Sequence, residues 1–259
     1  MIKKLICISL FAFFASSVFG SSGGGPLRVG MELSYPPFEM TDESGNPDGV
    51  SVEIARALGD YLDRPVEIIN TPFQGLIPAL RTGKIDLILS SMTRTEERAR
   101  AIDFSDPYLT TGLTLLVNSE SDIDSIEGID SDSTLAVKQG TTGHLYAVRN
   151  FPDSNILVLE KESAAVLEVV QGKADVFIYD QMSVFKHWQR NQDTTRAILD
   201  PFRKEYWAIG LRKGDDKLRS EVNQFLIAFK EKGGFDELGT EYLSEQKKAF
   251  KEMGYPFIF

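Results

Sequence analysis

Cysteine is almost absent from this chain of 259 residues, and the one cysteine, Cys7, lies in an apolar N-terminal segment. The rest of the chain therefore has no sulfur for a disulfide, a thiolate nucleophile or a metal. The two histidines, His144 and His187, are not spaced as metal ligands, and we expect each on a helix surface. No phosphate-binding loop, Gly-x-Ser-x-Gly motif or zinc signature occurs. We expect no cofactor and no metal.

Long apolar runs are equally scarce, and the one long run is Leu5–Phe19. Two lysines precede it and small residues end it, which is the pattern of a signal peptide rather than a membrane span. We predict a signal peptide over residues 1–20, cleaved after Gly20, and therefore a periplasmic or other extracytoplasmic location. Cys7 has too little apolar sequence before it to be a lipoprotein acceptor.

Basic residues are in the minority, with 28 Lys and Arg against 38 Asp and Glu and a formal net charge of −10. This balance argues against nucleic acid or an anionic membrane surface as a partner. After the predicted cleavage about 239 residues remain, enough for one large domain or two modest ones. We expect a monomer.

What the chain does contain is an alternation of strand and helix patterns, which predicts an α/β fold with parallel strands. The first half reads as strand, helix, strand, helix, strand, at 27–33, 48–62, 65–69, 73–81 and 85–90. Two helices, over 215–232 and 235–247, are expected to complete the fold.

An internal repeat suggests two similar lobes. Residues 76–88 and 165–177 both read as a helix, a Gly-Lys-x-Asp turn and an apolar strand. In this register Ser91, after the first strand, matches Asp180, at the end of the second. Because ligands of open α/β sheets bind beyond the carboxyl ends of the strands, both residues would face a cleft between the lobes. Chance similarity of two short turns is the alternative.

The stretch 90–108, SSMTRTEERARAIDFSDPY, contains the most informative candidate. A strand ends in Ser90 and Ser91, and after Thr93 a short helix begins at Thr95. Arg98 stands in the first turn of that helix, where the helix dipole disfavours a cation. A bound carboxylate would compensate through a bidentate pair. The alternative is a solvated, charged helix end.

Two other strand ends have similar chemistry. The turn after strand 134–138 contains Thr141 and Thr142, either of which can cap a helix and donate to an oxyanion. Asp180 ends the apolar strand 176–179 and precedes a helix pattern. Without further information, a simple helix N-cap is the favoured interpretation of both sites.

Several of these segments together resemble the extracytoplasmic solute-binding proteins of ABC transporters, in the family that binds polar amino acids. The resemblance covers nearly all of the mature chain. The matching segments are Tyr35-Pro36-Pro37-Phe38-Glu39, the residues 73–80 and 90–108, Lys138-Gln139-Gly140-Thr141-Thr142, and 175–180.

The resemblance implies a type II periplasmic-binding-protein fold with two lobes, each a mostly parallel sheet flanked by helices, joined by a two-stranded hinge. Lobe 1 would comprise 26–107 and 208–259, and lobe 2 would comprise 113–202. The hinge strands would lie near 108–112 and 203–207. Such a hinge allows closure around a ligand.

The resemblance also implies roles for the candidate residues. Arg98 would bind the ligand carboxylate with help from Thr93, Thr141 and Thr142. Asp180 would bind the ammonium group, together with the backbone carbonyl of Ser91. The aliphatic part of the ligand would lie between two aromatic rings in Pro-flanked loops, Tyr35 and Phe73.

Glu32 and Lys138 bear on specificity, because by resemblance both lie near the end of the ligand side chain. An acid there suits a cationic or amide side chain, and Lys138 would neutralise part of its charge. We therefore favour a neutral polar side chain such as that of glutamine. Either residue could instead point to solvent.

The sequence thus predicts a binding protein that delivers a free polar amino acid to an ABC permease and breaks no bond. One alternative is a cyclohexadienyl or arogenate dehydratase on the same scaffold, which would need a proton donor with a raised pKa in a closed cleft. Asp180 and Glu32 would be the plausible acids. A ligand-sensing binding protein is the other alternative.

Overall fold

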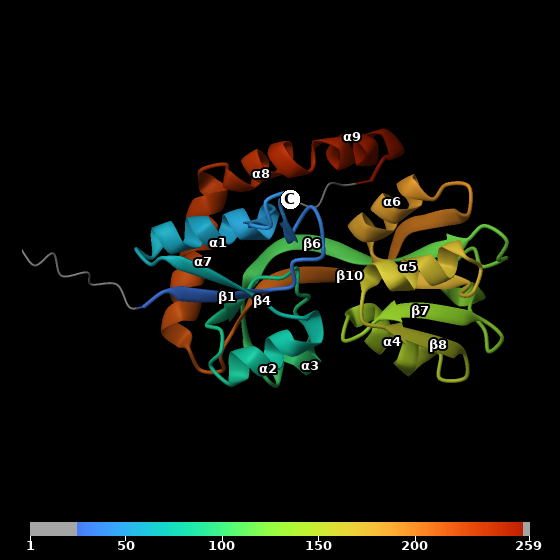
Figure 1. Ribbon diagram of the computed structural model, residues 1–259, viewed down its shortest axis with the longest axis horizontal. Helices are drawn as coiled ribbons and strands as arrows, with labels where there is room; N and C mark the ends of the chain where they lie inside the picture. The colour runs from blue at the N-terminus through green and yellow to red at the C-terminus, as the bar shows by residue number, and fades with distance from the viewer. Residues whose placement is uncertain (1–24, 256–259) are drawn as a thin grey trace, which may run out of the picture.

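The computed structural model describes residues 25–255, so the predicted signal peptide lies outside the described residues. The chain forms two α/β halves side by side, joined by two long strands (Figure 1). No described helix has both the length and the apolar composition needed to cross a membrane.

Within residues 25–255 the main sheet has eight strands, in the order β4-β1-β5-β10-β6-β9-β7-β8. Within each half the neighbouring strands are parallel, β4-β1-β5 in one and β9-β7-β8 in the other. The strands are β1 (Leu27–Met31), β4 (Val66–Asn70), β5 (Leu87–Ile88), β6 (Asp103–Asn118), β7 (Thr134–Lys138), β8 (Asn155–Leu159), β9 (Val176–Asp180) and β10 (Thr195–Leu211), with a separate hairpin of β2 (Met40–Thr41) and β3 (Pro47–Asp48).

Helices cover both faces of each half (Figure 1). The first half has α1 (Val50–Tyr61), the 3₁₀ turn η1 (Phe73–Gly75), α2 (Leu76–Arg81), α3 (Glu96–Ala99), α7 (Asp216–Glu231), α8 (Gly234–Tyr242) and α9 (Ser244–Met253). The second half has η2 (Ile126–Gly128), α4 (Thr142–Asn150), α5 (Glu162–Val170) and α6 (Gln181–Arg190).

The halves are joined by β6 and β10, which run antiparallel to each other across the junction. The predicted hinge segments fall inside these strands, where Gly112 pairs with Lys204 and Leu109 with Trp207. The two-lobe α/β architecture is therefore confirmed. The residue at which each lobe ends stays a prediction.

The internal repeat has a structural basis at its glycine and its aspartate. Gly83 and Gly172 follow the ends of α2 and α5 with positive φ angles of 72° and 67°, a conformation that a side chain disfavours. Asp86 and Asp175 then accept the backbone N–H of the neighbouring parallel strand, from Arg28 at 3.0 Å and Thr134 at 2.7 Å. Each repeat therefore ends by fixing its strand to the strand beside it.

The C-terminal region differs from expectation. The segment 235–247 is not one helix, because Leu243 leaves helical geometry and buries its side chain completely, separating α8 from α9. Helix α9 then reaches the second half, where the ring of Phe250 packs edge-on against Phe185 of α6 at 5.0 Å between centroids. The C-terminal helix therefore contacts both halves of the molecule.

Candidate functional site

A cavity that is partly open to solvent lies between the two halves and in front of β6 and β10. It is built at the carboxyl ends of parallel strands β1, β5, β7 and β9, as the strand order requires. All ten residues predicted from the sequence line it: Glu32, Tyr35, Phe73, Ser91, Thr93, Arg98, Lys138, Thr141, Thr142 and Asp180. The cavity is also lined by Glu39, Ser90, Leu113, Tyr179, Glu205 and Trp207.

Arg98 is buried in this cavity, 7% exposed, so its interpretation as a solvated helix end is wrong. Helix α3 begins as predicted, with the Thr95 side chain accepting the Arg98 N–H. The guanidinium donates to two backbone carbonyls, that of Thr93 at 2.7 Å and that of Gly140 at 3.0 Å. It forms no ion pair with any residue in the described part of the chain.

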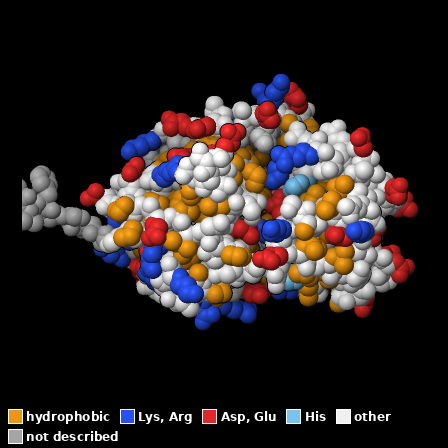
Figure 2. Space-filling model, viewed as in Figure 1, with side chains coloured by type: hydrophobic (Ala, Val, Ile, Leu, Met, Phe, Trp, Pro, Cys, Tyr) orange, Lys and Arg blue, Asp and Glu red, His pale blue; other side chains and the backbone are white. Residues whose placement is uncertain are grey.

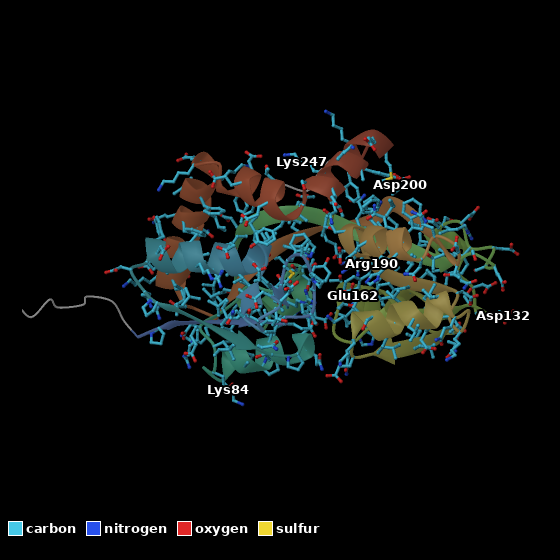
Figure 3. All side chains as sticks on the ribbon, turned by 45° about the horizontal axis from the view of Figure 1, so that its top comes forward. Lys84, Asp132, Glu162, Arg190, Asp200 and Lys247 are labelled. Carbon is cyan, nitrogen blue, oxygen red and sulfur yellow. The ribbon has the colours of Figure 1, made fainter. Side chains whose placement is uncertain are left out.

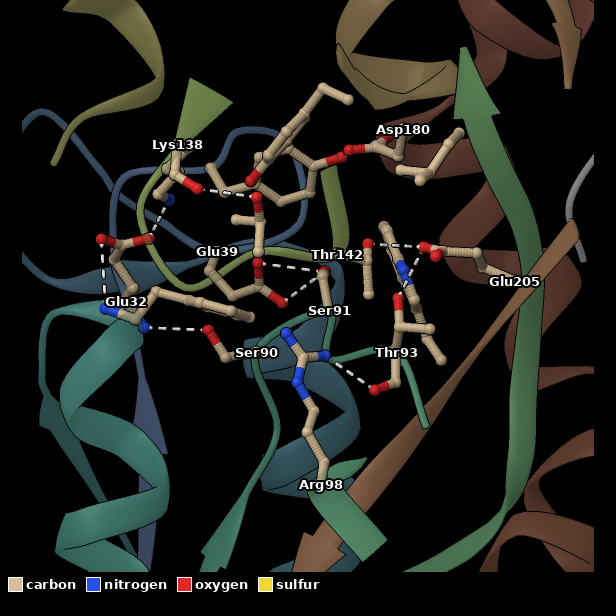
Figure 4. Close-up of a pocket in the computed structure, with 16 residues that line it drawn as sticks. Glu32, Glu39, Ser90, Ser91, Thr93, Arg98, Lys138, Thr142, Asp180 and Glu205 are labelled. Atoms are coloured by element: carbon tan, nitrogen blue, oxygen red, sulfur yellow. Dashed lines mark hydrogen bonds and ion pairs between the residues drawn. The ribbon is translucent and has the colours of Figure 1, made fainter. Parts of the chain in front are cut away.

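Burial lowers the pKa of the Arg98 guanidinium to about 10, which leaves it cationic at neutral pH. Glu205 acts in the opposite direction through its charge, but it forms no ion pair with Arg98 in the described chain. The hydrogen bonds of this buried cation go to carbonyl groups, and an incoming carboxylate would relieve the cost of its burial. Gly140 belongs to the second half of the molecule, so Arg98 also links the two halves. Figure 4 shows the guanidinium reaching into the cavity beside Thr93.

Asp180 faces the cavity from the end of β9 and is also the N-cap of α6. Its Oδ1 accepts three hydrogen bonds, from the Tyr35 hydroxyl at 2.7 Å and from the N–H groups of Met182 and Ser183 at 3.1 Å each. None of these bonds uses Oδ2. Both interpretations of Asp180 are therefore compatible, since one oxygen caps the helix while the other remains for a ligand.

Burial raises the pKa of Asp180 to about 6, although the Tyr35 hydrogen bond acts in the opposite direction. A cation bound beside the carboxylate would favour its ionised form and lower this pKa. The ammonium group of a ligand would have this effect.

The hydroxyl protons of Thr93 and Thr142 do not point into the open part of the cavity. Both donate to Oε2 of Glu205, at 3.0 and 2.9 Å. Thr141 caps α4 through the N–H of His144 and donates to the Lys138 carbonyl, so its hydroxyl is also engaged. Within the described chain, Arg98 is thus the better candidate than these hydroxyls for donating to a carboxylate.

Glu205 and Glu39 are the two cavity carboxylates that the sequence did not suggest. Burial raises the pKa of Glu205, whose other oxygen has no hydrogen-bond partner in the described chain. Glu39 accepts hydrogen bonds from the hydroxyls of Ser51 and Ser91, and burial raises its pKa to about 8. Glu39 is therefore mostly a neutral acid at pH 7.

Glu32 and Lys138 form an ion pair across the cavity, between the loop after β1 and the end of β7. The Lys138 side chain is only 1% exposed, so its alternative placement in solvent is wrong. The ring of Phe73 lies 5.6 Å from the Lys138 ammonium and 5.4 Å from the Arg98 guanidinium carbon, within cation–π range of both.

Tyr35 forms the opposite aromatic wall, and its packing explains its fixed position. Its ring stacks on Phe38 at 5.5 Å and meets Trp207 edge-on at 6.0 Å. Trp207 and Glu205 face inward from β10, whereas Tyr206 between them is 42% exposed. Glu205 has no signal of its own in the sequence, because the burial of its neighbours in β10 does not alternate regularly.

Chemically, the cavity places a cation and an acceptor carboxylate at separate positions, with aromatic and ionic groups between them. No group of three or more described side chains is arranged to hold a metal ion. The arrangement is complementary to a ligand that carries both a negative and a positive group.

Residues 27–245 match the bacterial extracellular solute-binding proteins, family 3, and the chain belongs to this family. The match spans both halves of the molecule and the cavity between them.

Individual relatives extend this assignment. The chain is 28% identical over 251 residues to the L-arginine-binding protein of Pseudomonas aeruginosa, covering 93% of this chain and 97% of the relative. It is 31% identical to an ancestral arginine-binding protein bound to glutamine, with a TM-score of 0.78 and coverage of 85% of this chain and 98% of that one. It is also 35% identical to an ancestral amino acid-binding protein, a precursor of cyclohexadienyl dehydratase, with a TM-score of 0.77 and coverage of 84% and 95%.

Proposed function

We propose that this protein binds a free polar L-amino acid between its two halves and delivers it to an ABC permease outside the cytoplasm. The observation that carries the proposal is the buried Arg98, which has no ionic partner in the described chain, placed in the same cavity as the free Oδ2 of Asp180. A carboxylate on Arg98 and an ammonium on Asp180 would satisfy both groups. The amino acid-binding relatives support this interpretation.

The subsites for the rest of the ligand follow from the same geometry. The Ser91 carbonyl would share the ammonium with Asp180, and Tyr35 and Phe73 would enclose the aliphatic part. Thr93 and Thr142 would assist at the carboxylate through backbone N–H groups, because their hydroxyl protons are donated to Glu205. Thr141, whose N–H and hydroxyl both donate to the Lys138 carbonyl, would assist by capping α4 at the carboxylate site. No bond is broken in this scheme, and the protein acts as a monomer.

We propose a neutral polar side chain, of the glutamine type, as the preferred ligand. Lys138 is the protein's own cation beside Glu32, so a second cation from the ligand would meet an acid that is already paired. An amide can donate to Glu32 and accept from Lys138 at the same time. A cationic ligand would have to displace Lys138 from a fully buried position.

The test is a thermal-shift screen against the twenty amino acids, followed by calorimetry on those that raise the melting temperature. A ligand present at a hundred times its Kd adds about 2.7 kcal/mol to the free energy of unfolding. We expect glutamine to give the largest shift and aspartate and glutamate to give none. Failure of all twenty amino acids to bind would refute the proposal.

A dehydratase is the second candidate, favoured by one specific observation. Glu39 is a neutral carboxylic acid lining the cavity at pH 7, which is what proton donation to a leaving hydroxyl requires. One structural neighbour is itself described as a dehydratase precursor. Incubation with arogenate or prephenate, followed by absorbance of the aromatic product, separates the two functions. We expect no product.

A further inference from the structure

A second group of charged side chains lies outside the cavity, where α5 and α6 meet the first half of the molecule. Its centre is Glu162, the first residue of α5, whose side chain is 5% exposed and lies near the junction of the halves (Figure 3). Oε1 of Glu162 accepts from Ser183 at 2.6 Å and lies 2.6 Å from Nε2 of His187 and 3.5 Å from Nζ of Lys186.

These contacts correct the expectation that His187 lies on a helix surface, since its side chain is only 12% exposed. A carboxylate can only accept, so Nε2 of His187 carries the proton that it shares with Glu162. Burial opposes ionisation of Glu162, but the His187 hydrogen bond and the charge of Lys186 together lower its pKa to about 2. Glu162 is therefore a permanent anion.

Lys186 is the member of this group that reaches across the junction. Its ammonium donates to the Pro36 carbonyl at 3.1 Å and lies 5.4 Å from the centre of the Tyr35 ring. Its side chain is 13% exposed. Basic side chains and a histidine are visible along the junction on the face shown in Figure 2.

The contact with Tyr35 connects this group to the proposed ammonium site. Tyr35 donates to Asp180, and Asp180 caps the same helix, α6, that carries Lys186. Lys186 thus fixes the loop after β1 from one side while Asp180 holds the Tyr35 hydroxyl from the other. The position of Tyr35 in turn directs its bond to Oδ1 and leaves Oδ2 open.

We infer that Lys186 is a positioning residue for the ammonium site, fastening the Tyr35–Pro36 loop to α6 while Glu162 neutralises its charge. The inference rests on the proposed function. Without Glu162, the Lys186 cation near Asp180 would repel a ligand ammonium. Without Lys186, Tyr35 would lose its anchor, and Asp180 would face an unbalanced Glu162.

The electrostatic part of the inference has a measurable signature in the pH dependence of binding. The groups that face Asp180 are Tyr35, Tyr179, Glu162 and Lys186. Among these, Lys186 lowers the pKa of Asp180 and Glu162 raises it. Removing the Lys186 charge takes away one of the effects that lower this pKa, while the Tyr35 and Ser183 hydrogen bonds remain. The pH below which binding weakens therefore moves upward.

The test compares Lys186→Met and Lys186→Arg with the wild type, using calorimetry for the amino acid that the screen identifies, from pH 5 to 8. Lys173→Met is the matched control, because Lys173 is an exposed lysine of the same half at the turn between α5 and β9. For Lys186→Met we expect a Kd about tenfold weaker at pH 7 and a binding midpoint at higher pH. Lys186→Arg retains the charge and donors, and Lys173→Met leaves the site intact, so both should match the wild type.

Each outcome decides between the two proposals. If the wild type binds none of the amino acids, the proposed function is wrong and this inference falls with it. If the wild type binds but Lys186→Met keeps the wild-type Kd and midpoint, only the role of Lys186 is overturned. Weaker binding without a shifted midpoint, or without rescue by Lys186→Arg, also overturns it. Should Lys186→Met fail to fold, Lys186→Gln takes its place with the same expectations.

Discussion

Replacing Arg98 with alanine removes the only cavity cation that has no ionic partner in the described chain. The guanidinium is held by two carbonyls, so a ligand carboxylate would be its first anionic contact. Removing one partner of a buried, hydrogen-bonded charge pair costs roughly 3–5 kcal/mol. We therefore expect the Kd of the amino acid to rise by about 10² to 10⁴ in Arg98→Ala.

Calorimetry measures this change directly, and two further variants make it specific. Arg98→Lys keeps the charge but not the planar bidentate geometry, and should lie between the wild type and Arg98→Ala. Arg100→Ala removes an exposed arginine that follows the same short helix, and should bind normally. A Kd for Arg98→Ala within threefold of the wild-type value would refute the assignment of the carboxylate site.

Three other predictions concern the cavity carboxylates. The pKa of Asp180 is about 6 without a ligand, so calorimetric affinity should fall up to about tenfold per unit below pH 6, and this dependence should be absent in Asp180→Asn. Burial raises the pKa of Glu39 to about 8, so between pH 4.5 and 8 the folded state binds a proton that the unfolded state has lost. Over that window the free energy of unfolding should fall by about 1.4 kcal/mol per pH unit as the pH rises. Denaturant unfolding should show a shallower decline for Glu39→Gln, and an identical decline would count against the assignment. Lys138→Met leaves Glu32 unpaired, so the ratio of Kd values for glutamine and arginine should shift about tenfold or more toward arginine, whereas an unchanged ratio would show that the pair does not set specificity.

The sequence was sufficient for the architecture because the signals there are local and repeated. The Gly-Lys-x-Asp turns fixed both strands of the repeat, and their aspartates make the same bond to a neighbouring strand. The register of that repeat placed Ser91 and Asp180 at equivalent strand ends, and both line the cavity. The sequence pointed to Arg98 because the helix dipole disfavours a cation in the first turn of a helix.

The missing parts of the site depend on tertiary packing. Nothing in the sequence of β10 distinguishes Glu205 from its neighbours. It belongs to the site only because Thr93 and Thr142, from opposite halves of the molecule, donate hydrogen bonds to it. Glu39 was read as part of a motif, but its role depends on Ser51, a helix residue twelve positions later, and on Ser91. Such carboxylates have no local pattern of their own.

A crystal structure of the protein with its amino acid bound is the most direct test of the central claim. The account predicts the ligand carboxylate within hydrogen-bond distance of the Arg98 guanidinium, and its ammonium within that distance of Oδ2 of Asp180. A ligand bound with its carboxylate away from residue 98, or bound outside the cavity between the halves, would contradict it.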